Sequence, residues 1–183
     1  MLQYNVSSLF ILISNYFPMS SSEQIYEETR KLVATTRERG LPEGYRLMAG
    51  TPTGEEYRNL RHLTGLSPKT IEQSELALKG AWYFTVIKDA ADIAVGMGRI
   101  VADGGWYFHI TDIAVHPSHQ RMGLGDAIMA DLMSRIMDKA PPAPYVNLMA
   151  DSAGRKLYAK WGFVETAPRS VGMERRFDGP RPS

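Results

Sequence analysis

Two glycines, Gly123 and Gly125, stand directly before a segment with a helical pattern of apolar residues, and Arg121 precedes them. The first amide groups of a helix have no partner inside the helix, and the helix dipole adds partial positive charge there. Because glycine lacks a Cβ atom, it lets the backbone approach a bulky anion closely. These residue types in this order predict a turn that binds a phosphate group, with a plain tight turn as the alternative.

Two common phosphate motifs are excluded by the residues that follow. A G-x-G-x-x-G dinucleotide turn would need glycine at the position of Ile128, and the G-K-[ST] of a Walker A loop does not follow. Residues 110–115 are rich in β-branched side chains, which favours a buried strand, and Pro117 ends it. After the turn, apolar residues recur every three or four positions, so the segment is predicted to be strand, turn and helix.

Composition bounds the class of protein. The 183 residues fit one domain, and 44% of them are hydrophobic, which is enough for an ordinary core. The net charge of +1 gives no argument for binding nucleic acid or a membrane surface. The absence of cysteine excludes disulfides and thiolate chemistry, and it agrees with a cytoplasmic location. His116 and His119 lack a further ligand beside them, so no metal site is predicted.

The strand-turn-helix segment resembles motif A of the GNAT superfamily, the acyl-CoA-dependent N-acyltransferases. That motif reads V-x-P-x-x-[QR]-x-x-G-x-[GA], and its positions here hold Val115, Pro117, Gln120, Gly123 and Gly125. Residues 150–163 are similar to the N-x-x-A-x-x-L-Y-x-x-x-G-F ending of these domains. The resemblance covers residues 45–177 and implies a single α/β domain, with a mixed, mostly antiparallel twisted sheet flanked by helices.

The resemblance implies transfer of an acetyl group from acetyl-CoA to the primary amine of a small molecule by direct attack, without a metal. The alternatives are a protein N-terminus or a lysine as acceptor, and a CoA-binding module without catalysis. A nicotinamide enzyme is a further rival, argued only by the two glycines. No nucleic acid or membrane partner is expected, and a homodimer is one possibility.

The resemblance assigns the acyl donor to the central strand and to the turn. The pantetheine arm would pair with the strand backbone, and the pyrophosphate would lie on the turn. Asp126 and Asp151 depart from the residues usual in the family, and a carboxylate at Asp126 should repel a phosphate, although it also suits the helix dipole. The residues expected to contact the donor are Ile113, Ala114, Val115, Gln120, Arg121, Met122, Gly123, Leu124, Gly125, Asp126, Asp151, Arg155 and Tyr158.

Tyr158 matches the family tyrosine near the thioester sulfur, which implies that its phenol donates a proton to the leaving thiolate. The family's base often lies on the central strand, where His109 and Asp112 are the candidates, with Glu72 or water in reserve. The period of two along a strand predicts His109 on the same face as Ile113, and Asp112 on the other face. A packed residue without a catalytic role is the alternative for both Tyr158 and His109.

The acceptor is expected to contact two helices that follow the first strand, as in the family, and aromatic residues of the sheet. The charged helix residues are candidates, with plain solvation as the alternative; they are Arg58, Arg61, Glu72 and Glu75. The aromatic residues that could form an apolar wall, with Trp82 and Phe84 preferred, are Trp82, Tyr83, Phe84, Trp106, Tyr107 and Phe108. Since side chains alternate along a strand, about half of these rings must face the other side.

The remaining chain supplies the elements that position these residues. Other helices are predicted over residues 22–39, 53–62, 67–78 and 152–161, and strands over residues 45–49, 82–88, 93–102, 106–115 and 145–150. Residues 163–166 and 170–177 are predicted to form a closing hairpin. Residues 19–44 are interpreted as an extra helix and link, residues 1–18 as a disordered, swapped or non-native extension ahead of a start at Met19, and residues 178–183 as a loose tail.

Overall fold

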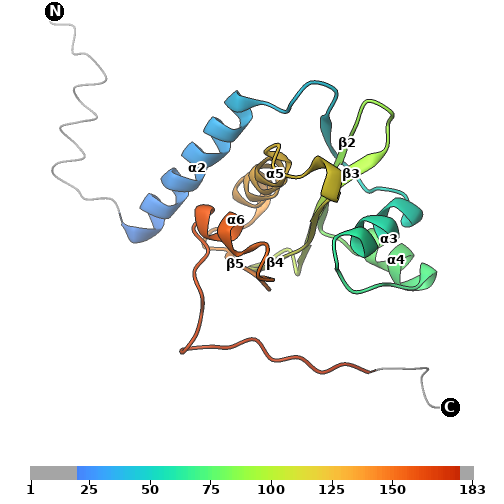
Figure 1. Cartoon of the computed structure of the whole chain (residues 1–183). Helices are drawn as coiled ribbons and strands as arrows, with labels where there is room; N and C mark the ends of the chain where they lie inside the picture. Colours follow the sequence, from blue (N-terminus) through green and yellow to red (C-terminus); the bar gives the residue numbers. More distant parts are fainter. Residues whose placement is uncertain (1–19, 178–183) are drawn as a thin grey trace, which may run out of the picture.

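The computed structural model of the chain describes residues 20–177, so the interpretations of residues 1–19 and 178–183 lie outside the described part. Figure 1 shows the arrangement of the elements. In chain order they are α2 (Ser21–Arg39), β1 (Arg46–Ala49), α3 (Gly54–Leu63), α4 (Ile71–Lys79), β2 (Tyr83–Lys88), β3 (Ala94–Ala102), β4 (Tyr107–Val115), the 3-10 helix η1 (Pro117–His119), α5 (Leu124–Lys139), β5 (Tyr145–Leu148) and α6 (Arg155–Lys160).

The five strands form one sheet in the order β1-β2-β3-β4-β5. Neighbouring strands run antiparallel, except that β4 and β5 are parallel. A parallel pair needs a long crossover connection, and α5 provides it between β4 and β5. The mixed, mostly antiparallel sheet flanked by helices is therefore confirmed. Figure 1 places α2 and α5 on one side of this sheet, and α3 and α4 on the other.

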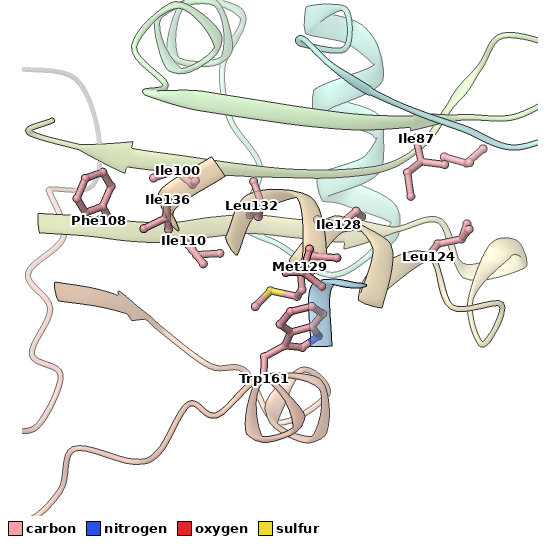
Figure 2. Close-up of a cluster of buried hydrophobic side chains, with 13 residues drawn as sticks. Ile87, Ile100, Phe108, Ile110, Leu124, Ile128, Met129, Leu132, Ile136 and Trp161 are labelled. Atoms are coloured by element: carbon pink, nitrogen blue, oxygen red, sulfur yellow. The ribbon is translucent and has the colours of Figure 1, made fainter. Parts of the chain in front are cut away.

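The larger core lies between the sheet and α5, and we call it the first core. Ile87 and Phe108 enter it from the strands, and Ile128 and Leu132 enter it from α5, all of them fully buried. Figure 2 shows the α5 side chains between the strands and Trp161, which closes the core from the end of α6. The helical period after the turn thus places one face of α5 on the sheet, as the sequence predicts.

The smaller core lies on the opposite face of the sheet, and we call it the second core. Tyr57 and Leu60 of α3 pack there against Phe84, Met97 and Ala114 of the strands. Each of these five side chains is less than 5% exposed. Each buried strand side chain therefore lies in either the first core or the second core. The core in which it lies shows the face of the sheet to which it points.

The extra helix α2 packs on α5 rather than on the sheet. Val33 reaches the first core, and Arg37 donates a hydrogen bond of 2.9 Å to the Ser134 hydroxyl of α5. Ile25 of the same helix is 63% exposed. The helix buries mainly small polar residues, since its other buried positions are Thr29 and Thr36. Among the helices of residues 20–177, none is both long and apolar enough to cross a membrane.

Capping residues define where the helices begin. Thr53 and Glu56 form a capping box at the start of α3, where the sequence predicts a helix over residues 53–62, and the side chain of each accepts a hydrogen bond from the backbone of the other. The second helix was predicted from Ser67-Pro68, and that boundary is wrong by a few residues. Thr70 caps α4 instead, because its hydroxyl accepts a hydrogen bond from Gln73 N at 3.1 Å while the Gln73 side chain accepts one from Thr70 N.

The predicted closing hairpin is not formed, because no strand lies between residues 161 and 177. Gly162, at a φ of 81°, ends α6, and Figure 1 shows the following chain running away from the sheet. Val171, Met173 and Phe177 alternate as in a strand but remain 64%, 90% and 87% exposed. An alternating pattern makes a strand only when a neighbouring strand pairs with it, and within residues 20–177 no strand pairs with this segment, although β5 ends the sheet.

Close contact between α5 and the sheet requires glycine at position 98 of β3. A Cβ atom there would lie 2.6 Å from Ile128 Cγ2 and 3.1 Å from Leu132 Cδ1. We therefore expect Gly98→Ala to lower the free energy of unfolding by about 1–3 kcal/mol, the usual cost of overpacking a core. Urea unfolding followed by tryptophan fluorescence measures the change.

The matched control is Gly105→Ala in the turn before β4, where a Cβ would have its nearest neighbour at 3.6 Å, an ordinary contact. This control should unfold within about 0.5 kcal/mol of the wild type, as surface substitutions usually do. Equal stability of Gly98→Ala and the wild type would show that α5 can move away from β3 at little cost.

Candidate functional site

A bulge at Asp112 divides the central strand β4 into two parts. Arg99 of β3 pairs with Thr111, whereas Met97, two residues earlier, pairs with Ala114, so β4 has one extra residue between them. Asp112 lies in this bulge and has a φ of 56°. This is the left-handed region, which aspartate adopts more readily than most residues. The direction in which each later side chain points is therefore reversed.

The bulge overturns the predicted faces of the strand. Phe108 and Ile110 belong to the first core before the bulge, but Ile113 packs on that core after it, and Ala114 belongs to the second. By alternation from Phe108 and Ile110, His109 points to the face of the second core, where Asp112 also lies. The prediction that His109 shares a face with Ile113, opposite Asp112, is wrong because an uninterrupted period of two was assumed.

One edge of β4 is left without a strand partner after the bulge. Pairing with β5 begins at Tyr107 and ends at Ile110, which lies opposite Leu148. Beyond that pair β5 stops, and within residues 20–177 no strand pairs with residues 111–115 on the side away from β3. The predicted donor-binding residues of the strand, Ile113 to Val115, thus lie along an edge that can pair with an extended ligand.

The predicted phosphate turn joins this edge to α5. Arg121 and Gly123 have φ values of 64° and 82°, and Gly123 occupies the N-cap position of α5. No side chain caps that end, so the first amides of α5 lack the partner that Thr53 or Thr70 supplies elsewhere. Gly125 lies close to α6, because a Cβ there would be 3.3 Å from Leu157 Cδ2. Arg121 is exposed.

Asp126, in the first turn of α5, has three side-chain partners, of which two are cations. Lys160 Nζ lies 2.6 Å and Arg39 Nη1 3.5 Å from its Oδ2, and Trp161 Nε1 donates to its Oδ1 at 3.1 Å. Burial would raise the pKa of this carboxyl, but the hydrogen bonds from Lys160 and Trp161 outweigh burial and lower it. The predicted repulsion of a phosphate is therefore opposed by two cations beside Asp126, and the same contacts hold α6 and α2 against α5.

Tyr158 lies half-buried on α6, with its ring over Gly154, where a Cβ would be 2.6 Å from Tyr158 Cε2. Burial, followed by the nearby charge of Asp151, raises the pKa of the phenol above its ordinary value. Tyr158 is therefore protonated at neutral pH. Its hydroxyl has no hydrogen-bond partner within residues 20–177. Arg155 and Asp151 of the predicted donor set are exposed, and Arg155 lies 3.7 Å from Glu165.

His109 is half-buried and contacts the neighbouring strand, where its Nδ1 lies 2.7 Å from the Asn147 side-chain oxygen. The sequence did not identify Asn147. The available signal was the position of Asn147 as a polar residue between Val146 and Leu148, which both pack on the first core. Such a residue indicates that the other face of the strand could be functional. Tyr107 also reaches Asn147 Oδ1, at 3.5 Å.

Asp112 is the centre of a buried ion network. Tyr57 Oη donates to its Oδ2 at 2.6 Å, Arg99 Nε donates to the same oxygen at 2.6 Å, and Arg61 Nη1 donates to Oδ1. Both Asp112 and Arg61 have side chains only 6% exposed. Burial would raise the pKa of Asp112, but the Tyr57 hydrogen bond and the charges of Arg99 and Arg61 outweigh it and lower the pKa. Neither Tyr57 nor Arg99 was identified from the sequence.

The structure separates the predicted acceptor residues. Phe84 is only 4% exposed and lies edge-on to Tyr57 in the second core, so it does not line an open surface. Trp82 packs 5.1 Å from Phe108 on the first-core side, away from His109. Arg58 donates a hydrogen bond of 2.8 Å to Ser74, which joins α3 to α4. The two acidic candidates of α4 are exposed, and they are Glu72 and Glu75.

The two loop histidines have protein partners. His119 Nδ1 lies 2.8 Å from the Tyr45 hydroxyl, and His116 Nδ1 accepts a hydrogen bond from Ser118 N at 3.2 Å. Residues 20–177 contain no group of three or more His, Asp or Glu side chains arranged to hold a metal ion.

Comparison with known proteins defines the class of protein. Residues 50–177 match the family model of the acetyltransferase (GNAT) domain, and the chain therefore belongs to the GNAT family of acetyltransferases. The resemblance stated from the sequence is confirmed.

This chain is similar to several known proteins, three of which are compared below. The probable acetyltransferase SA2161 of meticillin-resistant Staphylococcus aureus, a protein of unknown function, is 40% identical; the match covers 73% of this chain and 99% of that chain, with a TM-score of 0.69. The uncharacterized N-acetyltransferase ycf52 of Pyropia yezoensis is 26% identical over 121 residues, 64% of this chain and 68% of that protein. The GNAT protein SP0256 of Streptococcus pneumoniae, 23% identical with a TM-score of 0.60 over 74% of this chain and 99% of that chain, shows the fold alone.

Replacing the buried carboxylate of Asp112 should destabilise the domain. Asp112→Asn leaves two buried guanidinium groups without a counter-charge, so we expect the free energy of unfolding to fall by about 3–5 kcal/mol. Since the pKa of Asp112 is lowered by folding, its stabilisation is complete above the unfolded-state pKa and is lost as the pH falls through the folded one. The gap between wild type and variant should therefore narrow below about pH 4.

The matched control is Asp92→Asn, which makes the same change at another positive φ, 64°. Asp92 pairs with Arg46 and Lys88 but its side chain is 67% exposed, so the loss of stability should be small compared with that of Asp112→Asn. Urea titrations at several pH values measure both variants. Equal losses would contradict the assignment of Asp112 as the central charge of the fold.

Proposed function

We propose that this protein transfers an acetyl group from acetyl-CoA to the primary amine of a small molecule. The observation that carries the proposal is the unpaired edge of β4 at residues 111–115, which leads directly to the uncapped N-terminus of α5. An unpaired edge can hydrogen-bond an extended amide chain, and a free helix N-terminus can bind a pyrophosphate. Acetyl-CoA has these two parts in this order, a pantetheine arm and a pyrophosphate.

The donor-binding residues follow from this placement. Ile113, Ala114 and Val115 would pair through their backbone, and residues 120–125 would surround the pyrophosphate with amides and the exposed Arg121. The charge of Asp126 is offset by Lys160 and Arg39, so Asp126 remains one of the proposed donor contacts at the turn. Asp151 and Arg155 remain proposed contacts at the start of α6.

Two side chains would move protons. His109 would take one proton from the ammonium form of the acceptor, which frees the lone pair that attacks the thioester carbon. A C–N bond forms and the C–S bond breaks, and Tyr158 would give its proton to the departing thiolate. The nitrogen loses its second proton as the amide forms, and that proton replaces the one lost by Tyr158. The net products are the amide, free CoA and one proton passed from His109 to water.

We assign Asp112 to positioning rather than to proton transfer. Both carboxylate oxygens already accept hydrogen bonds from Tyr57, Arg61 and Arg99, and its lowered pKa makes it a weak base. The acceptor side is the face of His109 and Asp112, toward α3 and α4, where Arg58 and Glu72 remain candidate contacts. A small-molecule acceptor, a cytoplasmic location and a homodimer remain predictions from the sequence.

Release of free CoA tests the activity. We expect a thiol reagent to detect CoA when acetyl-CoA is mixed with one of several pools of small amines, and the protein adds no background because it has no cysteine. Calorimetry with acetyl-CoA and with NAD serves as the binding control. Binding of acetyl-CoA without release from any amine or peptide pool would favour the non-catalytic module, and binding of NAD alone would contradict the proposal.

Tyr158→Phe tests the acid. Removing the hydroxyl should lower kcat by about 10²–10⁴-fold, the usual contribution of a general acid, while Kd for acetyl-CoA stays within about twofold. Because burial raises the pKa of Tyr158, any alkaline limb that it causes should lie at higher pH than for an ordinary phenol in the wild type. Tyr26→Phe on α2 is the control and should leave turnover unchanged. An unaltered kcat in Tyr158→Phe would remove Tyr158 from the reaction.

A further inference from the structure

We propose that Asn147 is a positioning residue that fixes His109 as the tautomer with the proton on Nδ1, which leaves Nε2 as the atom that accepts the proton of the amine. The catalytic part of this inference, that Nε2 accepts the proton of the amine, rests on the proposed function. Its structural part, the tautomer, is a separate property of the ring and can be measured without turnover.

The first step of the argument is the contact itself. His109 Nδ1 lies 2.7 Å from Asn147 Oδ1, a short hydrogen bond. A carbonyl oxygen can only accept, so the hydrogen must belong to Nδ1. In a neutral imidazole with Nδ1–H, the other nitrogen carries the lone pair. Nε2 of His109 has no hydrogen-bond partner within residues 20–177, and is therefore free to accept a proton.

The second step is the orientation of the amide, since its oxygen and nitrogen could be exchanged. Asn147 Nδ2 lies 3.5 Å from the Phe108 carbonyl oxygen, toward which it donates. An exchanged amide would bring two acceptor oxygens together there and lose that contact. The Tyr107 hydroxyl also donates toward Asn147 Oδ1, at 3.5 Å. The backbone carbonyl therefore selects the orientation in which the oxygen faces His109.

The third step is the rigidity of the pair. His109 and Asn147 lie directly opposite each other in the parallel register of β4 and β5, one pair before the strands stop pairing. Both strands have their opposite side chains in the first core, Phe108 and Ile110 from β4 and Val146 and Leu148 from β5. The pair is therefore held at the point where the unpaired edge of β4 begins, which is where the proposed thioester would lie.

The fourth step is the charge around the ring. On the same face of the sheet, Asp112 is paired with Arg61 and Arg99 and accepts a hydrogen bond from Tyr57. The Tyr107 hydroxyl contacts Asn147 instead. The Asp112 carboxylate is fully engaged by its own partners, so it does not compete with Asn147 for the imidazole. A neutral amide beside His109 orients the ring without adding a charge that would favour the imidazolium form.

The test measures the tautomer and the reaction separately. In the wild type, ¹⁵N spectra of the His109 ring at alkaline pH should show the proton on Nδ1, with His109→Gln used to assign the signals. In Asn147→Leu, the signal should move toward the Nε2-protonated form, and kcat/KM should fall by about tenfold or more, part of what a general base contributes. Asn59→Leu, on the exposed surface of α3, is the matched control and should change neither.

A second variant separates positioning from a loss of folding. Asn147→Asp keeps an oxygen that accepts from Nδ1, so the tautomer should be retained, while the added negative charge should move the acid limb of the kcat/KM profile to higher pH by roughly one unit. Circular dichroism of each variant checks its fold.

The outcomes distinguish the two claims. A wild-type ring protonated on Nε2, or an unchanged tautomer in folded Asn147→Leu, would overturn the positioning role of Asn147. Full activity in His109→Gln, with the Nδ1 tautomer present in the wild type, would support the effect of Asn147 on the ring and overturn His109 as the base of the proposed function.

Discussion

The buried carboxylate of Asp112 is the interaction on which the site depends. It lies at the bulge where the regular ladder between β3 and β4 is interrupted, and its partners come from α3 and from β3. Two guanidinium groups and a phenol could not be buried at this point without a negative charge between them. The network therefore holds the bulge in place, and the bulge reverses the later side chains of β4.

A second group of charges organises the other end of the site. Asp126 would be unfavourable beside a phosphate if it were alone, but Lys160 and Arg39 approach it from α6 and α2. These contacts draw the helix of Tyr158 toward the turn of Gly123 and Gly125. The carboxylate that breaks the family pattern thus helps to place two cations and the proposed acid around the same turn.

Local patterns in the sequence were sufficient for most of the fold. The helical period of α5, the helix over residues 53–62 and the β-branched run of β4 each depend on neighbouring residues, and each was predicted correctly. The errors concern pairing between distant segments. A bulge is defined by the register of β4 against β3, so the alternation around His109 could not reveal it, and residues 163–177 show alternation without a partner strand.

The missed site residues have the same explanation. Asn147 is remote from His109 in the chain, and only the parallel register of β4 and β5 brings the two together. Nothing in the sequence around Arg99 and Tyr57 marks them as site residues. Their role is evident only in the structure, where both donate hydrogen bonds to Asp112. The motif residues, by contrast, are contiguous, so the turn could be recognised from the sequence.

The helix α2 has a consequence for how the boundaries of this protein are drawn. The match to the family begins at residue 50, yet Val33 fills part of the first core, Arg37 bonds Ser134 of α5, and Arg39 approaches Asp126 at the proposed phosphate turn. A fragment cut at the family boundary would expose the flank of α5 and lose a cation of the site. The unit that packs together is therefore longer than the part that matches the family model, and α2 adds a cation beside the turn at which the donor is proposed to bind.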